Sequence, residues 1–370
     1  MARTIAFFLP QFHETKENNE WWGKGFTEWT NVKNAEPCYK GHIQPRVPLN
    51  DNYYNLLEKE TMIWQTKLVN DAGMEGLCYY HYWFKGRKIL EKPAENLLEW
   101  KDIPQKFCFS WANESWKRTW DKTEGNDWNE VLDKKYNESG NRGNGVLLEQ
   151  NYGTEEDWIE HFDYLLPFFK DERYITYNGR PVFIIYRPSK IECLDEMLRC
   201  WQERAKEAGI NKLYIIATNE SVKLSPYIDA SLCYEPSYTM NHDMHFRYRI
   251  RDKVASVIKK HNMTFLRKYD YALFLRKILK RVKMEEKIFP GIFVGFDDTP
   301  RRGKNGAVFK NVSPEVFEDA FSQLLRKGNE DDFVFITAWN EWAEGAYLEP
   351  DTINSYAYLE AIRNAKLKNE

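Results

Sequence analysis

Two glutamates near the C-terminal end of the chain, Glu341 and Glu344, have the residue type and spacing of an acid and base pair. If the chain turns helically there, their Cβ atoms lie about 5–6 Å apart. Retaining glycosidases hold two carboxyl groups roughly 5–5.5 Å apart. The neighbouring Trp339, Asn340 and Trp342 offer flat apolar faces and an amide for a sugar ring. The stretch predicts cleavage of a glycosidic bond. A packed strand end whose acids cap a helix or pair with arginines is the alternative.

The pair follows an apolar run of the kind that forms a parallel strand buried on both faces. Seven similar runs precede it in the chain. The eight predicted strands are residues 4–9, 76–80, 106–111, 181–186, 213–218, 230–234, 291–296 and 333–338. Amphipathic stretches predict helices between several of them, at residues 54–72, 155–170, 191–209 and 314–328.

This alternation predicts one α/β domain over residues 1–370, a single (β/α)8 TIM barrel with long βα loops, because no linker rich in Pro, Gly or Ser divides it. A doubly wound open sheet is the alternative. No Gly-rich phosphate loop follows the first run, however, which leads into Pro10 and Gln11 instead. We expect the eighth strand to pair in parallel with the first and close the barrel.

Polar and aromatic residues follow most of these runs, at the end of a barrel where active sites lie. Any one of them could belong to an ordinary loop, so the argument rests on their convergence at one mouth. The predicted substrate-binding residues at the strand ends are Tyr80, His81, Tyr82, Trp83, Trp111, Asn113, Glu114, Trp116, Tyr186, Arg187, Tyr234, Glu235, Asp297, Asp298, Arg301 and Arg302.

Two long loops are predicted to shape the mouth. Residues 20–29 form a tryptophan-rich βα loop that presents Glu28 and Trp29 to a ligand, or that is merely pinned by its tryptophans. Residues 116–151 are rich in Gly, Asn and charge, and predict a surface insertion at one end of the groove. Aromatic residues make up 16 % of the chain, which suits a groove that stacks on carbohydrate.

Composition argues against several other functions. The 370 residues carry a net charge of −3 and no recognised nucleic-acid-binding motif, so we expect no nucleic-acid partner. The six cysteines show no C-x-x-C spacing, and the His242-x-x-His245 pair does not by itself make a recognised metal motif, so no metal or other cofactor is predicted. The first apolar run is too short for a secretory signal and no run of about 20 apolar residues appears, which predicts a cytoplasmic protein.

A basic stretch lies within the predicted excursion between the sixth and seventh strands, residues 237–287. Residues 247–287 carry 14 Lys and Arg against four acids, with aromatic and aliphatic residues at spacings that allow an amphipathic helix. A solvated charged face is the usual explanation. The alternative is contact with an anionic membrane surface or polymer, which would make the protein membrane-peripheral.

Six motifs together resemble the bacterial glycoside hydrolase family 99-like group, whose members are often labelled glycosyltransferases of O-antigen or lipopolysaccharide biosynthesis. The motifs lie at residues 26–32, 41–45, 79–83, 111–114, 297–302 and 339–345. Related family 99 endo-α-mannosidases and endo-α-mannanases imply a (β/α)8 barrel that needs no metal and retains anomeric configuration. Their Asn-Glu-Trp-x-Glu-Gly motif matches residues 340–345 of this chain.

The resemblance implies roles for the two glutamates. In the family 99 enzymes the first Glu is the base on the sugar 2-hydroxyl, giving a 1,2-anhydro sugar, and the second is the general acid. Carried over, Glu341 is the base and Glu344 the acid of an endo-acting hydrolase of an oligo- or polysaccharide. We further expect Glu344 to be protonated and Glu341 ionised in the resting protein, because two close carboxylates repel and one pKa rises.

Two alternatives to hydrolysis stay open. One is a glycosyltransferase or transglycosylase that makes lipopolysaccharide or capsular polysaccharide. The other is a carbohydrate-binding barrel that has lost catalysis, although binding alone does not need an acid and a base on one side.

Overall fold

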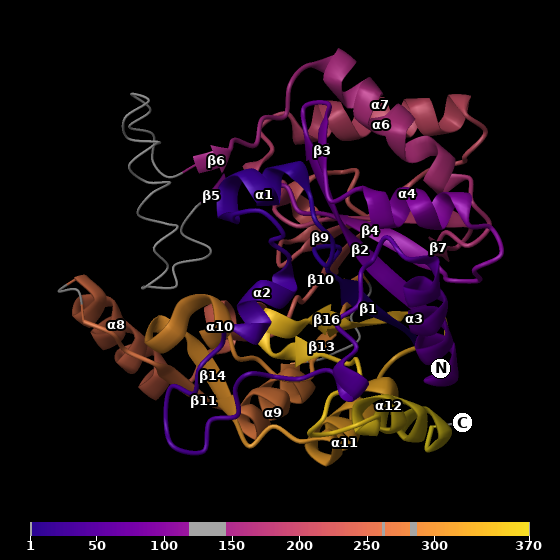
Figure 1. The fold of residues 1–370 in the computed structure, drawn as a ribbon. Coiled ribbons are helices and arrows are strands. Elements are labelled where there is room, and N and C mark those ends of the chain that lie inside the picture. Colours follow the sequence, from indigo (N-terminus) through magenta and orange to yellow (C-terminus); the bar gives the residue numbers. More distant parts are fainter. Residues whose placement is uncertain (1, 118–145, 261–262, 282–286, 370) are drawn as a thin grey trace, which may run out of the picture.

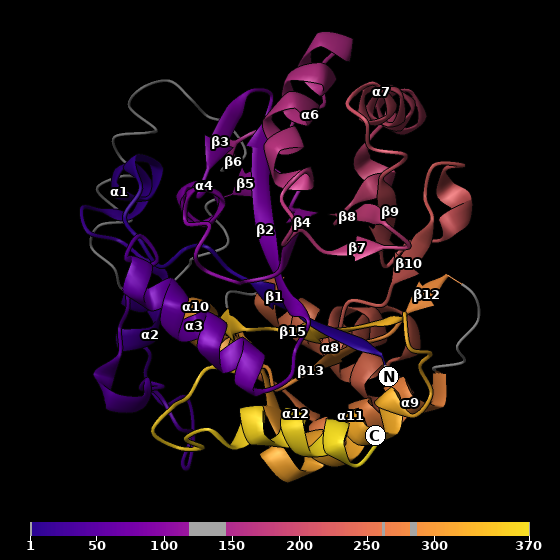
Figure 2. The ribbon, with the colours of Figure 1, turned by 90° about the vertical axis from the view of Figure 1, so that its right-hand side faces the viewer.

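The chain folds into a closed barrel of parallel strands surrounded by helices (Figures 1 and 2). The computed structural model describes residues 2–117, 146–260, 263–281 and 287–369. Each barrel strand is hydrogen-bonded in parallel to its neighbour in the order of the chain. The barrel strands are β1 (Arg3–Phe8), β2 (Gly76–Phe84), β4 (Phe107–Trp111), β8 (Arg180–Ile185), β9 (Tyr214–Thr218), β10 (Ala230–Leu232), β12 (Ile288–Phe289) with β13 (Gly291–Phe293), and β15 (Phe333–Thr337).

The predicted barrel closure is confirmed. β15 pairs in parallel with β1, with Arg3 opposite Phe333 and Ala6 opposite Ile336. The seventh strand differs from the prediction, because it is divided at Pro290: β12 pairs with β10 and β13 pairs with β15. Proline has no N–H to donate to a ladder, so the strand changes partner at this residue. The predicted seventh strand, which began at residue 291, therefore lacks β12, the segment that pairs with β10 and completes the barrel.

Helices cover the outside of the barrel (Figure 2). The four predicted helices are all present, as α3 (Lys59–Asp71), α6 (Glu155–Phe169), α7 (Leu194–Glu207) and α11 (Pro314–Leu325). Their ends have clear local causes. Thr154 and Asp157 form a capping box at the start of α6, and Ser313 accepts a hydrogen bond from Val316 N ahead of Pro314 in α11. The other outer helices are α4 (Lys92–Glu99), α9 (Tyr271–Arg281) and α12 (Ala357–Leu367).

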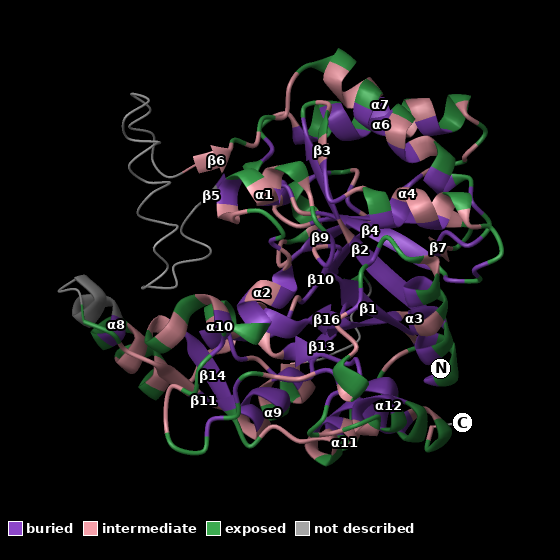
Figure 3. Cartoon of the chain, in the orientation of Figure 1, coloured by how far each residue is buried: buried purple, intermediate pink, exposed green. Residues whose placement is uncertain are grey.

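Aromatic side chains fill the barrel interior beneath its mouth. The ring of Phe7 lies 5.6 Å from Tyr80, 4.9 Å from Tyr234 and 5.7 Å from Phe335 between ring centroids. Aromatic pairs at these distances stabilise beyond their buried area, by about 0.5–1.5 kcal/mol each. The core therefore supports the mouth from below with side chains of β1, β2 and β15. Figure 3 shows the strands buried and the outer faces of the helices exposed.

The excursion between the sixth and seventh strands contains several ordered elements. A π-helical turn (Thr239–Asp243) leads into α8 (Phe246–Lys260), β11 (Arg267–Asp270) and α9. β11 pairs in parallel with β14 (Ala307–Lys310), which follows the seventh strand, and forms a small second sheet that was not predicted. Both strands are short, and β11 is mostly polar, so neither has the pattern of a barrel strand.

The expected insertion at residues 116–151 is only partly described. β5 (Trp116–Lys117) pairs with β6 (Val146–Leu148) in antiparallel fashion, and residues 118–145 lie outside the described part of the chain. None of the described helices has the length and apolar character needed to span a bilayer.

Candidate active site

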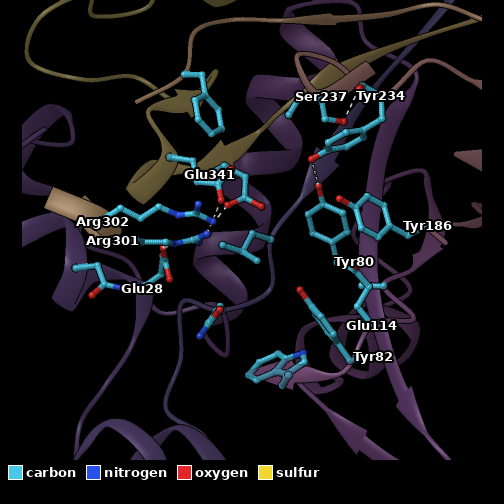
Figure 4. Close-up of a pocket in the computed structure, with 18 of the residues that line it drawn as sticks. Glu28, Tyr80, Tyr82, Glu114, Tyr186, Tyr234, Ser237, Arg301, Arg302 and Glu341 are labelled. Carbon is cyan, nitrogen blue, oxygen red and sulfur yellow. Dashed lines mark hydrogen bonds and ion pairs between the residues drawn. The ribbon is translucent and has the colours of Figure 1, made fainter. Parts of the chain in front are cut away.

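A cavity of about 420 Å³ lies at the mouth of the barrel. Figure 4 shows two of its surfaces, one bearing glutamates and arginines and the other bearing tyrosines. Of the predicted site residues, those that line the cavity are Glu28, Tyr80, Tyr82, Glu114, Trp116, Tyr186, Tyr234, Arg301, Arg302, Glu341 and Glu344. The structure thus brings residues from six of the eight strand ends, the first βα loop and the edge of the expected insertion to one place.

The two glutamates follow β15 on a tight hairpin. Glu341 lies in β16 (Asn340–Glu341), which pairs with β17 (Ala346–Tyr347), and Glu344 ends the 3-10 turn between them. Gly345 closes the hairpin with a left-handed φ of 56°. A Cβ at this glycine would lie 2.9 Å from Cβ of Asp297. Only glycine therefore allows both the backbone conformation and the close approach.

One guanidinium connects the acids of the cavity. Arg301 donates to Glu28 from Nε at 2.8 Å and from Nη2 at 2.6 Å. It also donates from Nη1 to Glu344 at 2.6 Å and from Nη2 to Glu341 at 3.3 Å. Burial disfavours its charge, but the carboxylates raise the pKa of Arg301 well above its usual value. Three carboxyl groups thus share one permanent positive charge. We call these four residues the charged wall.

Glu341 is the more deeply buried member of the pair. Its side chain is 8 % exposed, against 28 % for Glu344. Burial and the nearby Glu344 raise the pKa of Glu341 to about 8, and Arg301 offsets only part of this. The raised pKa thus belongs to Glu341, which was expected to be the ionised member of the pair. This geometry favours the protonated form of Glu341 at neutral pH, because Glu341 is farther from water and has the longer contact to Arg301.

The position of Arg301 is set by a loop that is distant in sequence. Arg301 lies on the short helix α10 (Thr299–Arg302), and Asp297 accepts from Thr299 N at 3.1 Å and Thr299 Oγ1 at 2.6 Å. The second oxygen of Asp297 binds His42 Nε2 at 2.7 Å and Gln44 Nε2 at 2.9 Å. Asp297 N also donates to Glu344 O at 2.6 Å. The motif at residues 41–45 therefore holds the arginine against the pair.

The two aspartates after the seventh strand do not line the cavity at the mouth and instead support the backbone around it. Asp298 accepts from Ala307 N and pairs with Arg302 at 3.3 Å. Asp297 is occupied by the four bonds just described. Both side chains are buried, and their acceptors serve the backbone and the 41–45 loop. They were expected to contact substrate, but the structure places both of them outside the lining of the mouth cavity.

Tyrosines form the opposite surface of the cavity (Figure 4). We call Tyr80, Tyr82, Tyr186 and Tyr234 the tyrosine wall. The hydroxyls of Tyr80 and Tyr234 lie 2.6 Å apart. Burial raises the pKa of Tyr186 to about 12, and raises the pKa values of Tyr80 and Tyr234 well above that of a free phenol. These hydroxyls remain protonated and can donate or accept hydrogen bonds with sugar hydroxyls.

Strand alternation removes His81 and Trp83 from the cavity. Successive side chains of a strand point to opposite faces, so Tyr80 and Tyr82 face the mouth while His81 and Trp83 face the helices. His81 Nε2 lies 2.8 Å from His161 Nε2, and the Trp83 ring stacks on His161 at 4.5 Å. Burial lowers the pKa of His81 to about 3, so it stays neutral. Trp111 also packs on His161, at 4.8 Å, and lies with this group behind the barrel wall.

The framework below the hairpin is formed by Trp29, Trp339, Asn340 and Trp342. Trp29 Nε1 donates to Tyr54 O at 2.8 Å, and Trp342 Nε1 donates to Glu349 at 2.7 Å. Asn340 binds Leu9 N at 2.7 Å and Leu9 O at 3.0 Å, which fixes the hairpin to the end of β1. Trp339 is fully buried. All four were expected at the ligand, but the structure places them in packing that orients Glu341.

Three further predicted residues lie beside or behind the cavity. Asn113 binds the backbone of Arg187 at 2.8 Å and 2.9 Å. Arg187 pairs with Glu114 at 3.0 Å at the cavity edge. Glu235 is completely buried, and it accepts from Thr239 and forms an ion pair with Arg281. Glu235 thus anchors the excursion that follows β10.

Several lining residues were not predicted as site residues. They are Leu9, Gln11, Trp22, Phe26, Asn31, Ala112, Leu147, Pro236, Ser237, Met240, Phe296 and Thr337. Gln11 directly follows the first strand, which is a signal that could have found it. Asn31 lies one helical turn after Glu28 on α2 (Glu28–Lys33) and therefore shares its face. Met240 lies in a π-helical turn, for which the sequence has no comparable signal.

No group of three or more His, Cys, Asp and Glu side chains in the described residues could hold a metal ion. The acids of the cavity instead surround Arg301. The arrangement can hold a polyhydroxylated ring between the tyrosine wall and a buried carboxyl pair, with one proton available to that pair.

Comparison with known proteins agrees with this description. The (β/α)8 barrel fold is shared with solved structures described as glycoside hydrolases. A GH99 endo-alpha-mannosidase from Bacteroides thetaiotaomicron superposes with a TM-score of 0.52 at 15 % identity, covering 99 % of this chain and 96 % of that one. A structure described as a glycoside hydrolase-like protein gives a TM-score of 0.55 at 14 % identity, covering 98 % and 93 %.

The chain belongs to the family described as "Glycosyltransferase WbsX", whose profile matches residues 4–362. It is 30 % identical over 372 residues to a protein called "Uncharacterized protein WxcX" in Xanthomonas campestris pv. campestris strain B100. The same protein of a second strain, ATCC 33913, is also 30 % identical, over 374 residues. In both cases the match covers 98 % of this chain and 49 % of the relative, so the chain spans about half the length of these curated relatives.

Proposed function

We propose that this barrel is a carbohydrate-active enzyme that hydrolyses a glycosidic bond with retention of configuration. The observation that carries the proposal is the charged wall: a buried Glu341 and a partly exposed Glu344 on one guanidinium, facing a wall of neutral tyrosines across a cavity of about 420 Å³. The substrate class is an oligo- or polysaccharide, α-mannoside-like or a related surface polysaccharide, cut internally. The Bacteroides thetaiotaomicron protein whose fold this chain shares is described as a GH99 endo-alpha-mannosidase, which supports this substrate class.

In the proposed reaction Glu341 removes the proton of the 2-hydroxyl as its oxygen attacks the anomeric carbon. Glu344 gives a proton to the departing glycosidic oxygen, so the glycosidic bond breaks and a 1,2-anhydro sugar forms. Water then opens this ring: Glu344 takes the proton of the attacking water, and Glu341 returns its proton to the 2-oxygen. Two displacements at one carbon give net retention, and both carboxyl groups end as they began.

Substrate binding must move the proton of the resting pair. Burial favours the proton on Glu341 in the ligand-free protein, whereas the proposed reaction needs it on Glu344. We infer that a bound sugar brings its 2-hydroxyl to Glu341 and stabilises the carboxylate by donating to it. Glu344 then exchanges its contact with Arg301 for the proton. The roles of Trp342 and Asn340 are to position Glu341, and those of Asp297 and His42 are to position Arg301.

Transfer to a second saccharide is the other candidate reaction, and the description of the family as a glycosyltransferase favours it. The same intermediate would serve, with a sugar hydroxyl in place of water. An incubation with an added acceptor oligosaccharide separates the two reactions. Lengthened products indicate transfer, and shortened products alone indicate hydrolysis.

The proposal is tested by incubating the protein with a panel of mannans, rhamnans and O-antigen polysaccharides and analysing products by mass spectrometry. We expect cleavage of at least one member, and no cleavage by a Glu341→Gln/Glu344→Gln variant. The matched control is Glu360→Gln on the exposed face of α12, which should cleave normally. Binding of a polysaccharide by the protein, with no cleavage that depends on the pair, would overturn the proposal in favour of a carbohydrate-binding barrel.

A further inference from the structure

The helix α8 has an unusual distribution of side chains. Phe246, Ile250 and Val254 recur every four residues, so they share one face of the helix. They are 60 %, 59 % and 49 % exposed. Exposed apolar side chains are ordinary when scattered singly, but a row of three along one helix face leaves a continuous apolar stripe in water.

The opposite face of α8, and not the apolar stripe, packs against the rest of the protein. Tyr248 packs on Tyr269 at 5.2 Å, and Asp252 accepts from the Tyr269 hydroxyl at 2.6 Å. Arg251 stacks over both of these tyrosines, and Ala255 is buried. The helix therefore attaches to the protein through aromatic and polar contacts. Phe246, Ile250 and Val254 instead point outward.

Cations flank the stripe on both sides. Arg247, Arg249 and Lys253 are exposed and lie beside Phe246, Ile250 and Val254 on the helix surface. The surrounding segment, residues 247–287, carries 14 Lys and Arg against four acids in a chain whose net charge is −3. An apolar stripe bordered by Lys and Arg is the pattern of a helix that lies in the interface of an anionic bilayer.

The helix is also close to the mouth of the barrel. Ser237 and Met240 line the cavity, and the π-helical turn that contains Met240 ends three residues before α8 begins. In Figure 1, α8 projects from the side of the molecule on which α2 and α10 lie, and these two helices carry Glu28 and Arg301. A surface that binds α8 would therefore lie beside the cavity rim.

We propose that α8 docks this protein on an anionic lipid surface, with Phe246, Ile250 and Val254 in the headgroup and acyl boundary and the flanking cations on the lipid phosphates. The exposed stripe favours lipid over a soluble polyanion, because a polymer in water offers no apolar phase for three aliphatic and aromatic side chains. The inference concerns binding and holds whichever reaction the cavity performs.

The test is co-sedimentation of the full chain with vesicles of phosphatidylcholine, with and without phosphatidylglycerol. We expect binding to the anionic vesicles that weakens with salt and is much poorer on the neutral vesicles. Phe246→Ser/Ile250→Ser/Val254→Ser should bind at least about tenfold more weakly at physiological salt. Arg247→Gln/Arg249→Gln/Lys253→Gln should lose about tenfold or more, chiefly at low salt.

The matched control is Ile63→Ser/Leu367→Ser, on α3 and α12, whose side chains are 48 % and 60 % exposed and should not affect binding. All positions are exposed, so unfolding temperatures should stay close to that of the unchanged protein. Equal binding by the control and the stripe variant would overturn the proposal. So would full competition by dextran sulfate with no loss in the stripe variant, which indicates a polymer site, or a change from dimer to monomer in the stripe variant by light scattering, which indicates self-association.

Discussion

The two walls of the cavity are built in different ways. The tyrosine wall comes from the ends of three barrel strands and their immediate continuations, so the barrel register alone delivers Tyr80, Tyr186 and Tyr234 to the mouth. The charged wall joins residues from the first loop, the seventh strand end and the final hairpin, and Arg301 has to be held in place by Asp297. We infer that the tyrosine wall tolerates single changes, while the charged wall depends on each contact.

Loss of Arg301 should have the largest effect. Arg301→Gln removes the positive charge that three carboxyl groups share, so we expect kcat/KM to fall by roughly 10²–10³ on the substrate that the panel identifies, the range for loss of a preorganised charge or donor. The pH at which activity rises should also move upward, because Arg301 lowers the pKa of Glu341. Arg301→Lys should restore part of the activity, since it keeps the charge.

Misfolding would produce a similar loss, so a second variant is needed. Arg301→Gln leaves Glu28, which is 2 % exposed, without its ion pair. The double variant Glu28→Gln/Arg301→Gln removes that unpaired charge and should regain stability but not activity. Recovery of activity in the double variant would show that the arginine supports folding only.

The raised pKa of Glu341 predicts a specific dependence of stability on pH. The carboxyl group has a pKa of about 8 in the folded protein against 4.5 when unperturbed, so between these values the folded state binds a proton that the unfolded state has lost. The stability gained by burying Glu341 in its protonated form is fully present below pH 4.5 and is lost as pH rises through about 8. Glu341→Gln abolishes the loss and should be more stable than the unchanged protein at pH 9, by on the order of a few kcal/mol.

The measurement is denaturant unfolding of both proteins at pH 5 and pH 9. Near pH 5 the amide and the protonated acid are similar, so the two stabilities should nearly coincide. Glu349, whose pKa burial raises to about 7, titrates in the same window but is present in both proteins, so its contribution cancels. A stability difference that does not change with pH would contradict the placement of the proton on Glu341.

Substitutions in the tyrosine wall should have the smallest effect on kcat and KM. Tyr80→Phe removes one hydroxyl of the Tyr80–Tyr234 contact, and we expect KM to rise about twofold to tenfold with little change in kcat, in keeping with one neutral hydrogen bond. Tyr79→Phe is the matched control, because Tyr79 is buried on the same strand with its side chain on the other face. An equal change in both variants, or a fall in kcat as large as that of Arg301→Gln, would remove the distinction between the walls.

The barrel could be predicted from the sequence because buried strands leave a regular pattern of short apolar runs. Glu341 and Glu344 could be predicted because they closely follow the last of these runs. The sequence analysis assigned too many residues of β2 to the cavity. The alternation of strand side chains could have separated Tyr80 and Tyr82, which line it, from His81 and Trp83, which do not. The hydrogen bond between His42 and Asp297 could not be predicted from the sequence, because 255 residues separate the two. The raised pKa of Glu341 was not expected, because it depends on which glutamate is buried, and only three-dimensional packing decides that.

The dependence of rate on the leaving group tests the central claim most directly. Turnover by Glu341→Gln and Glu344→Gln is measured on the polysaccharide and on an activated aryl or fluoride glycoside of the same sugar. We expect Glu344→Gln to lose most on the polysaccharide and be partly spared on the activated substrate, which needs no proton on its leaving group, while Glu341→Gln is slow on both. Equal losses for the two variants on both substrates would contradict the assigned roles, and undiminished turnover in either would remove that residue from the mechanism.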